Sequence, residues 1–418
     1  MTFPLSPETW PFSLELLPAE ACLVGGAVRD AVLGRRADYL DLDFVLPRDA
    51  VKIARKLANH YNAGFVVLDK ERQIARVVFE GATVDLAQQE GDSVENDLYR
   101  RDFTINAIAY NPHSSQFIDP LQGVLDCQRS IIRMVSPANL QDDPLRLLRA
   151  YRQAAQLGFT IESDTQSVIR QLAPLLGQVA AERVQVELGY LLKSPQGTPW
   201  LIRAWEDNLL KSYFPDTTTE GMQKLTKLYH YKNILPETWS NLQVELLASV
   251  SGKSASLLSL AKLAKLLPSV PEVAEEQLRR LKYSRAEIKV VITALQYLPQ
   301  LLSHAYCEMS LREQYFFFQN VGSVFPALVV LAIVEGMGVE AIASLINRYL
   351  TPEDQVAHPT PLVTGNELMK TLNLPSGKQV GQLLTEIQIA RIESKIATWD
   401  EAIELAAQLI NSQGIANG

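Results

Sequence analysis

Cysteine is scarce in this chain, which has three among its 418 residues. Cys22, Cys127 and Cys307 stand far apart and show no paired spacing. A disulfide framework or a cysteine zinc site would need closely patterned pairs. The sequence indicates neither, and a reducing compartment is the natural setting for such a chain. We therefore expect a cytoplasmic protein.

Long hydrophobic runs are also absent. The most apolar stretch, from Phe325 to Val334, is shorter than the roughly 20 residues that span a bilayer, and Glu335 follows it directly. It is typical of a buried helix. The first 20 residues carry four prolines and several acidic side chains, which is not the pattern of a signal peptide. We expect no insertion into a membrane.

Basic residues are a minority: Lys and Arg number 39 against 47 Asp and Glu, a formal charge of −8. This balance argues against broad nonspecific binding to nucleic acid, but it leaves room for a local basic surface. The hydrophobic content of 47% is that of a globular protein. The length predicts two to four domains, given roughly 100 to 200 residues per domain.

Strand signals are confined to the first third of the chain. Between about residues 21 and 128 short β-rich runs alternate with helical patterns, and long amphipathic helices dominate afterwards. We therefore predict an α+β fold, with a small mixed sheet and helices in an N-terminal head and an all-α remainder. The predicted strands are residues 41–46, 64–68, 74–79, 83–86 and 116–118, and the predicted helices include 28–34, 49–60, 103–109, 144–157, 163–176 and 181–192.

Two aspartates one residue apart, Asp41 and Asp43, are the most informative feature. Side chains of a strand alternate between faces, so both carboxylates point the same way while Leu42 enters the core. Asp85 lies in another apolar-alternating run and could join them across the sheet. Three carboxylates suit two Mg²⁺ ions, one lowering the pKa of an attacking hydroxyl and the other bridging a triphosphate and its leaving pyrophosphate. The alternative for Asp85 is an exposed strand residue.

A glycine turn, Gly25-Gly26, lies about a dozen residues before the aspartates. It separates an apolar run from a helical pattern, so its free backbone N–H groups can face an anion at a helix N-terminus. Arg29 follows at the start of that helix, where its guanidinium can reach a bound phosphate. Alternatively, Arg29 is a surface residue paired with Asp30. A metal pair beside a phosphate cradle predicts nucleotide chemistry.

The segment from Arg100 to Asn106 places charged groups against an apolar helix pattern. Arg101 and Asp102 could hold the sugar hydroxyls of a nucleotide, as a donor and an acceptor side by side. Asp102 could instead be a helix N-cap, with Asn106 one turn later.

Asp143 and Arg146, three residues apart around the start of a helix, offer a carboxylate next to a guanidinium. Cytosine and adenine present an amino donor beside a ring-nitrogen acceptor, whereas uracil and guanine present the opposite order. Asp143 can accept from the amino group while Arg146 donates to the ring nitrogen, so the pair would select C and A without a template. The alternatives are that Asp143 caps the helix before Pro144 and that its arginines form a solvated face.

In these motifs the chain resembles the class II tRNA nucleotidyltransferases, the CCA-adding enzymes, and the related bacterial poly(A) polymerases of the polymerase-β-like superfamily. The resemblance covers residues 20 to 195, with a weaker echo from 361 to 408. The segments that carry it are Leu23-Val24-Gly25-Gly26-Ala27-Val28-Arg29-Asp30 with Asp41-Leu42-Asp43, Arg100-Arg101-Asp102-Phe103-Thr104-Ile105-Asn106-Ala107, Asp119-Pro120 to Gly123, Asp142-Asp143 to Arg152, and Glu182-Arg183-Val184.

The resemblance implies a catalytic head (residues 1–125), a base-recognising neck (126–195), a body (196–350) and a tRNA-binding tail (351–418). It implies nucleotide transfer from CTP, or also ATP, to the 3′ end of tRNA. The residue roles that it implies are triphosphate binding by Gly26 and Arg29, Mg²⁺ binding by Asp41 and Asp43, ribose binding by Arg101 and Asp102, base reading by Asp143 and Arg146, and phosphate contacts by Arg149 and Arg152. We also place Gly25 and Asn106 in the nucleotide site and Asp85 among the catalytic residues.

The chain departs from the family pattern in one informative place. Family members that complete the whole CCA end carry a flexible loop before the Arg-Arg-Asp segment, whereas fifteen residues separate Asp85 from Arg101 here. The resemblance therefore favours an enzyme that adds only the two cytidines and needs a separate A-adding partner. The alternatives are a full CCA-adding or A-adding enzyme, a poly(A) polymerase, and an inactive RNA-binding protein. No histidine precedes an aspartate, which argues against an added phosphohydrolase activity.

A basic segment near Arg279 to Arg285 spans a predicted helix boundary. It could bind tRNA phosphates, or it could be a solvated helix end.

Overall fold

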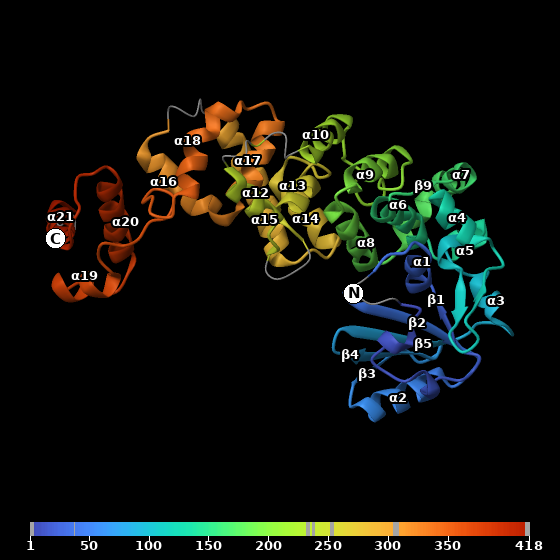
Figure 1. Ribbon diagram of the computed structural model, residues 1–418. Coiled ribbons are helices and arrows are strands. Elements are labelled where there is room, and N and C mark those ends of the chain that lie inside the picture. The colour runs from blue at the N-terminus through green and yellow to red at the C-terminus, as the bar shows by residue number, and fades with distance from the viewer. Residues whose placement is uncertain are drawn as a thin grey trace. The chain divides into compact units, whose positions relative to one another are not determined.

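The computed structural model describes residues 4–36, 38–230, 235, 239–250, 255–303 and 309–413; Cys307 and His304 lie outside them. The chain forms two compact units, Met1–Pro215 and Asp216–Gly418 (Figure 1). The first unit contains the predicted mixed sheet, and the elements described in the second unit are all helices. The predicted α+β class is therefore confirmed.

The sheet of the first unit has seven strands in the order β3-β4-β5-β2-β1-β6-β7. Its central pair, β2 and β5, is parallel, and the other neighbours are antiparallel. The strand bounds are β1 Cys22–Val24, β2 Leu40–Leu46, β3 Gly64–Asp69, β4 Ile74–Phe79, β5 Ala82–Gln88, β6 Ala109–Asn111 and β7 Gln116–Ile118. The predicted strands lie within one or two residues of these bounds.

The two faces of this sheet differ in character. Leu42 and Phe44 point to one face, where α2 (Ala50–Tyr61) packs and the ring of Trp10 contacts Phe44. Asp41 and Asp43 point to the opposite face, as alternation requires. The apolar face supplies the core, and the other face carries the charged groups.

One predicted helix of the head, residues 103–109, is wrong. The structure has a short 3₁₀ turn, η3 (Thr104–Asn106), followed by β6. Phe103, Ile105 and Ile108 are all fully buried. A helix with a single apolar face cannot bury all three, and the free edge of β1 pairs with the residues of β6. Tertiary contacts here override the local pattern.

Three helices after β7 in the first unit had predicted ranges. Those of α6 and α8 match closely, whereas α7 ends at Leu172 and continues as the 3₁₀ turn η4, which contains Pro174. Helices α4, α5 and α9 had no predicted range. Asp207 ties α6, α7 and α9 together by accepting from Tyr151 Oη (2.5 Å), Gln166 Nε2 (2.7 Å) and Arg170 Nε (2.6 Å). The bounds are α1 Gly26–Val32, α3 Val94–Leu98, α4 Gly123–Arg129, α5 Pro137–Asp142, α6 Leu145–Leu157, α7 Ser163–Leu172, η4 Ala173–Gln178, α8 Ala181–Lys193 and α9 Gly197–Glu206; β8 Ile131–Ile132 and β9 Thr160–Ile161 form a small second sheet.

The second unit is built around α17 (Phe325–Val334), whose residues are almost all buried. The helical stretch Leu311–Val334 is long and apolar enough to cross a membrane by composition, but 72% of its most apolar window is buried inside the protein. Such burial is typical of a core helix, as predicted for this segment. The other bounds are α10 Thr219–Tyr229, α12 Ser240–Leu247, α13 Leu257–Ala264, α14 Pro271–Arg280, α15 Arg285–Ser303, α16 Leu311–Val321 and α18 Val339–Leu350.

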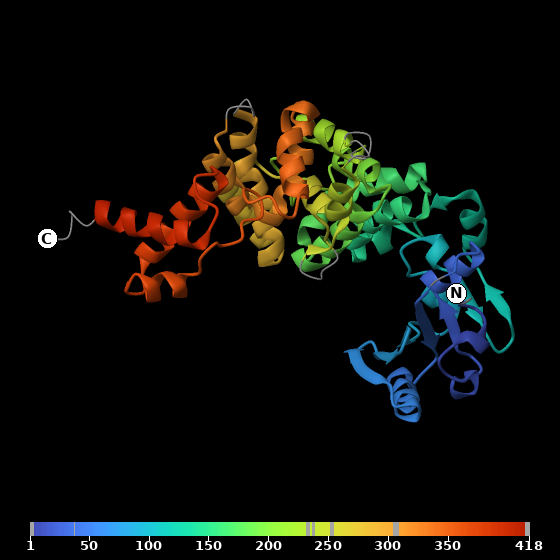
Figure 2. The ribbon, with the colours of Figure 1, turned by 60° about the vertical axis from the view of Figure 1, so that its left-hand side comes forward.

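The last three helices lie together (Figure 2). They have an apolar core of their own. Leu368, Leu383 and Ala406 are among its buried residues, one from each of α19 (Gly365–Thr371), α20 (Lys378–Ile392) and α21 (Trp399–Gln413). In the first unit, α9 packs on α6 and α8 although it begins after residue 195. The four-part division with boundaries at 125, 195 and 350 stays a prediction.

Candidate active site

The parallel pairing of β2 with β5 brings Asp43 and Asp85 side by side, with Asp41 one row away opposite Thr83. The three side chains share the charged face of the sheet because each occupies the same alternation phase. Asp41 Oδ1 accepts a hydrogen bond of 2.7 Å from the Thr83 hydroxyl. The strand register therefore gathers three carboxylates from two strands that lie far apart in sequence.

The proximity of these groups changes the chemistry of Asp43. Burial, together with the negative charges of Asp41 and Asp85, raises the pKa of Asp43 to about 6. The Arg101 and Arg76 guanidiniums oppose this rise. A carboxylate that repels its neighbours in this way is stabilised by any cation bound between them.

Asp85 differs from the other two because it has its own cation. Arg76, its partner on β4, donates from Nε to Oδ1 (2.7 Å) and from Nη2 to Oδ2 (2.8 Å). No group of three His, Cys, Asp or Glu side chains is arranged to hold a metal within the described parts of the chain. The carboxylates of Asp41 and Asp43 supply oxygen atoms of the kind that divalent cations bind.

The glycine turn lies immediately beside these carboxylates. Gly25 has φ +73°, which L side chains rarely adopt, and a Cβ there would stand 3.3 Å from Arg101 Nη1 and 3.5 Å from Asp43 Oδ2. The first N–H groups of α1 follow at Gly26. A cavity of about 210 Å³ lies here, lined by Gly26, Arg29, Asp30, Asp41 and Asp43, and also by Arg35 and Arg36, which sequence reasoning missed.

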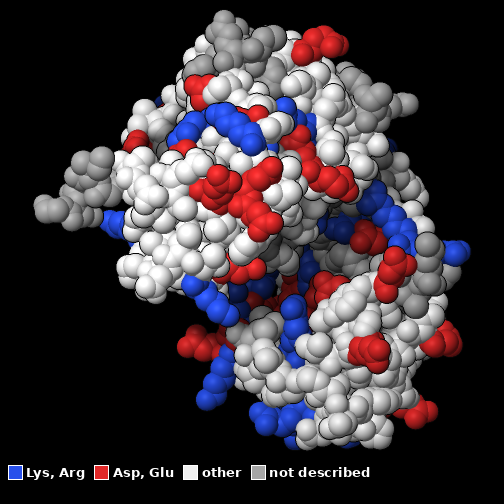
Figure 3. All heavy atoms as spheres, turned by 90° about the vertical axis from the view of Figure 1, so that its left-hand side faces the viewer, with Lys and Arg blue, Asp and Glu red and all other residues white. Residues whose placement is uncertain are grey.

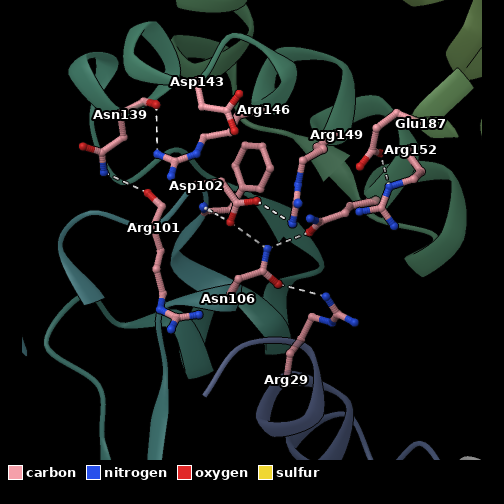
Figure 4. A network of polar contacts seen from close by, with 12 residues as sticks. Arg29, Arg101, Asp102, Asn106, Asn139, Asp143, Arg146, Arg149, Arg152 and Glu187 are labelled. Atoms are coloured by element: carbon pink, nitrogen blue, oxygen red, sulfur yellow. Dashed lines mark hydrogen bonds and ion pairs between the residues drawn. The ribbon is translucent and has the colours of Figure 1, made fainter. Parts of the chain in front are cut away.

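Arg29 forms the pair with Asp30 that was one of the two interpretations of the sequence, and it also bonds Asn106, which the sequence did not indicate. Its Nε donates to Asp30 Oδ1 (2.9 Å), and its Nη1 donates to Asn106 Oδ1 (2.8 Å). The Asn106 amide in turn donates to Asp102 Oδ1 and to Gln153 Oε1, both at 2.9 Å (Figure 4). Gln153 is buried on α6, and the sequence pattern gave no signal for it. The network links α1 to α6 through one amide.

Arg101 and Asp102 point in different directions (Figure 4). Arg101 Nη2 donates to Asp97 at 3.0 Å, whereas Asp102 Oδ2 pairs with Arg149 at 3.1 Å. Burial alone would raise the pKa of Asp102, but Arg149 and the hydrogen bond from Asn106 hold this pKa below its usual value. Asp102 is no helix N-cap, because the cap position of η3 is Phe103.

Asp143 is the C-cap of α5 and not the N-cap of α6. The N-cap of α6 is Pro144, and the Asp143 carboxylate accepts two hydrogen bonds from Arg183 of α8, at 3.1 and 2.9 Å. Arg146 Nη1 donates to the carbonyls of Arg100 (3.0 Å) and Asn139 (2.9 Å). The two side chains stand together beside the head (Figure 4), and Arg183, which belongs to the fifth sequence motif, completes the group.

The remaining arginines of α6 are engaged rather than free on a solvated face. Arg149 pairs with Asp102, and Arg152 pairs with Glu187 of α8 at 2.5 Å. A phosphate approaching Arg152 would compete with Glu187 for its guanidinium.

The second unit contains the basic segment noted in the sequence. The predicted helix boundary is confirmed, because α14 ends at Arg280 and α15 begins at Arg285. Arg279 and Arg280 remain 64% and 76% exposed while pairing with Glu275 and Glu276. On the face shown in Figure 3, Lys and Arg are interspersed with Asp and Glu rather than gathered in one broad basic patch.

Comparison with known proteins identifies the family. Three family models match: the "Poly A polymerase head domain" (residues 21–133), the "Probable RNA and SrmB- binding site of polymerase A" (158–220) and "tRNA nucleotidyltransferase domain 2" (255–407). The chain is 48% identical over 401 residues, 96% of each chain, to a CC-adding tRNA nucleotidyltransferase of Synechocystis sp.. It is 31% identical to an A-adding tRNA nucleotidyltransferase of Deinococcus radiodurans, over 92% of this chain and 94% of the relative.

The fold agrees with solved structures. A Thermotoga maritima CCA-adding enzyme complexed with tRNA aligns with a TM-score of 0.70 at 24% identity, covering 93% of this chain and 91% of that one. At this identity the likeness concerns the fold alone. By its sequence matches along nearly the whole length, this chain is an enzyme that belongs to the tRNA nucleotidyltransferases of the CCA-adding and bacterial poly(A) polymerase family.

Proposed function

We propose that this enzyme adds CMP, without a template, to tRNA 3′ ends and stops after the second cytidine. The observation that carries the specificity is the short connection between β5 and α3, residues 89–93. Gln89 N donates to the Leu46 carbonyl (2.8 Å), and Glu90 N donates to Asp97 Oδ1 (3.3 Å). A short connection held by these two hydrogen bonds has no long segment that could change the pocket from CTP binding to ATP binding. The CC-adding activity of the Synechocystis relative supports the same proposal.

Separate groups of residues in the chain would bind the triphosphate, the base and the ribose of the nucleotide. The N–H groups at Gly25 and Gly26, with Arg29, would hold the triphosphate, while Asp143 and Arg146 would read the base. Arg101 and Asp102 would hold the ribose, with Asn106 fixing Asp102. The Asp102 Oδ2 atom, which pairs with Arg149, would also accept a hydrogen bond from a ribose hydroxyl. Arg149 and Arg152 would contact phosphate. The buried amides of Asn106 and Gln153 keep the distance between phosphate and base sites fixed.

The family's chemistry uses a divalent metal, and we propose Mg²⁺ held by Asp41 and Asp43. Bound there, the metal would lower the pKa of the terminal ribose hydroxyl and offset charge on the leaving pyrophosphate. Arg76 orients Asp85 beside Asp43 through its two hydrogen bonds to the carboxylate. The negative charges of Asp41 and Asp85 act on Asp43, so a bound cation would change the pKa of Asp43 the most.

For the whole chain we propose a head, neck, body and tail with boundaries near residues 125, 195 and 350, with tRNA contacting the helical parts. The family model for RNA binding over residues 158–220 supports a contact with RNA there. We further propose a cytoplasmic enzyme that acts before a separate A-adding enzyme.

An incorporation assay tests the specificity. Purified protein with Mg²⁺ and each labelled nucleoside triphosphate is given tRNA transcripts that end before CCA, after C and after CC. We expect CMP on the first two and no addition to the third. AMP on the third transcript would indicate a CCA-adding or A-adding enzyme, and long adenylate tails a poly(A) polymerase. No incorporation on any transcript would contradict transfer altogether.

The pKa of Asp43 predicts how cation binding depends on pH. The metal binds the ionised carboxylate, and protons compete once the pH falls through about 6. The affinity for Mn²⁺, measured by titration calorimetry, should change little between pH 8 and 7 and fall by about tenfold per pH unit below 6. An Asp43→Asn variant should bind weakly at every pH. An affinity that stays constant down to pH 5 would contradict the role of Asp43.

A further inference from the structure

An apolar strip lies exposed at the β3 edge of the sheet. It consists of Val66 and Leu68 of β3 and Val78 of β4, whose exposed fractions are 51%, 48% and 43%. Val78 is uncovered because its cross-strand partner is Gly64, which has no side chain to lie over it. Isolated exposed valines are ordinary, but three together at one edge form a surface.

Val66 and Val78 of the strip share a face with the carboxylates, and Leu68 lies beside them at the register irregularity between Val67 and Asp69. Val66 is opposite Arg76, Arg76 is opposite Asp85, and Asp85 is opposite Asp43. In the next row, Val78 is opposite Thr83, which is opposite Asp41. Directly opposed side chains point to the same side of a sheet. The apolar strip and the carboxylates therefore lie on one continuous face of the sheet. Val66 is two strands away from Asp85, and Val78 is two strands away from Asp41.

Given the proposed function, the direction of the displacement determines which substrate lies near the β3 edge. The triphosphate is held at Gly26 and Arg29, directly after β1, so pyrophosphate leaves on the β1 side of Asp41 and Asp43. An in-line displacement requires the attacking hydroxyl to approach from the opposite side. In the strand order β3-β4-β5-β2-β1 that side is β5, β4 and β3.

We propose that Val66, Leu68 and Val78 form the surface on which the 3′-terminal nucleotides of the acceptor RNA lie while the terminal hydroxyl faces Asp43. An unpaired RNA end presents base faces and ribose C–H groups that pack on apolar side chains. Arg76, 40% exposed and already paired with Asp85, adds a cation beside the strip for the backbone phosphate.

The test is a Val66→Ser/Val78→Ser double variant assayed with tRNA that lacks its CCA end. The KM for tRNA should rise about fivefold or more, with kcat and the KM for CTP within about twofold of the parent values. Phe117→Ser is the matched control, since Phe117 is 49% exposed on the edge strand β7 at the other side of the same sheet. It should leave the KM for tRNA unchanged. An unchanged KM for tRNA in the double variant would overturn the proposal.

A crosslinking measurement separates this proposal from the proposed function. p-Benzoylphenylalanine placed at Val78 should crosslink to the last nucleotides of end-labelled tRNA, and the same group at Phe117 should not. This readout needs no catalysis, so it decides the role of the strip even if the parent protein transferred no CMP. Equal crosslinking at both positions would refute the proposal. If the parent protein self-associates and the double variant does not, with KM unchanged, the strip would instead be assigned to a contact with a second copy of the chain.

Discussion

Replacing Asp43 by alanine is expected to abolish CMP transfer, with kcat falling by about a thousandfold or more. Asp43 is central among three carboxylates, and its side chain lies close to the glycine turn where we place the triphosphate. Asp41 would remain as the single proposed ligand, and one carboxylate does not hold a divalent cation well. Single-turnover transfer of labelled CMP to tRNA lacking CCA measures the loss. Undiminished transfer in the folded variant would contradict the proposed chemistry.

The same change should not destabilise the protein without metal. The pKa of Asp43 in the folded state is about 6, above the unfolded value of 3.8. Its contribution to stability is therefore present below pH 3.8 and is lost as the pH rises through 6. At pH 7 the ionised carboxylate opposes folding, so Asp43→Ala should raise the free energy of unfolding by about 1 to 3 kcal/mol. Asp38→Ala, at an exposed position, should leave both activity and stability unchanged.

Replacing Asp143 by asparagine is expected to reduce the discrimination between CTP and UTP by about a hundredfold, because the charged acceptor for the cytosine amino group is lost. An amide can turn either its oxygen or its nitrogen toward the base, so it accepts from cytosine or donates to uracil. The change also removes one of the two hydrogen bonds from Arg183, because asparagine keeps only one side-chain oxygen as an acceptor. The ratio of kcat/KM for CTP to that for UTP is the measurement.

The neighbouring Asp142 supplies a matched control. It is exposed, and no described residue is seen to bond its side chain. Asp142→Asn should therefore keep the CTP to UTP ratio within about twofold of the parent value. If Asp142→Asn and Asp143→Asn change the ratio equally, base recognition does not depend on the carboxylate of Asp143.

Much of the fold followed from local patterns. Alternation in residues 41–46 placed Asp41 and Asp43 on one face, because the period of two is a property of any strand. The 3.6-residue period and Pro144 predicted α6 to within one residue. The pattern failed for residues 103–109, where every apolar side chain is buried and the edge of β1 supplied a pairing partner. The hydrophobic pattern of a short segment contains no information about a strand far away in sequence that pairs with it.

In the candidate site, too, local patterns predicted the residues but not their partners in space. Adjacent residues Arg101 and Asp102 were expected to act together, but the backbone directs one toward Asp97 and the other toward Arg149. Arg76, Gln153 and Arg183 hold Asp85, Asn106 and Asp143 in place, and sequence reasoning assigned a role to none of the three. Each is an ordinary polar residue in its own segment and gains a role only from its neighbour in space.

The sequence by itself determined the types of chemical group and their order: two aspartates on a strand, a glycine turn before them, and a carboxylate with arginines on a later helix. These follow from backbone periodicity and turn chemistry, which act over a few residues. Only the tertiary structure decided that β5 lies beside β2, which sets Asp85 against Asp43, and that one buried amide joins Arg29 to α6. Strand pairing and burial depend on the whole chain, and no local pattern encodes them.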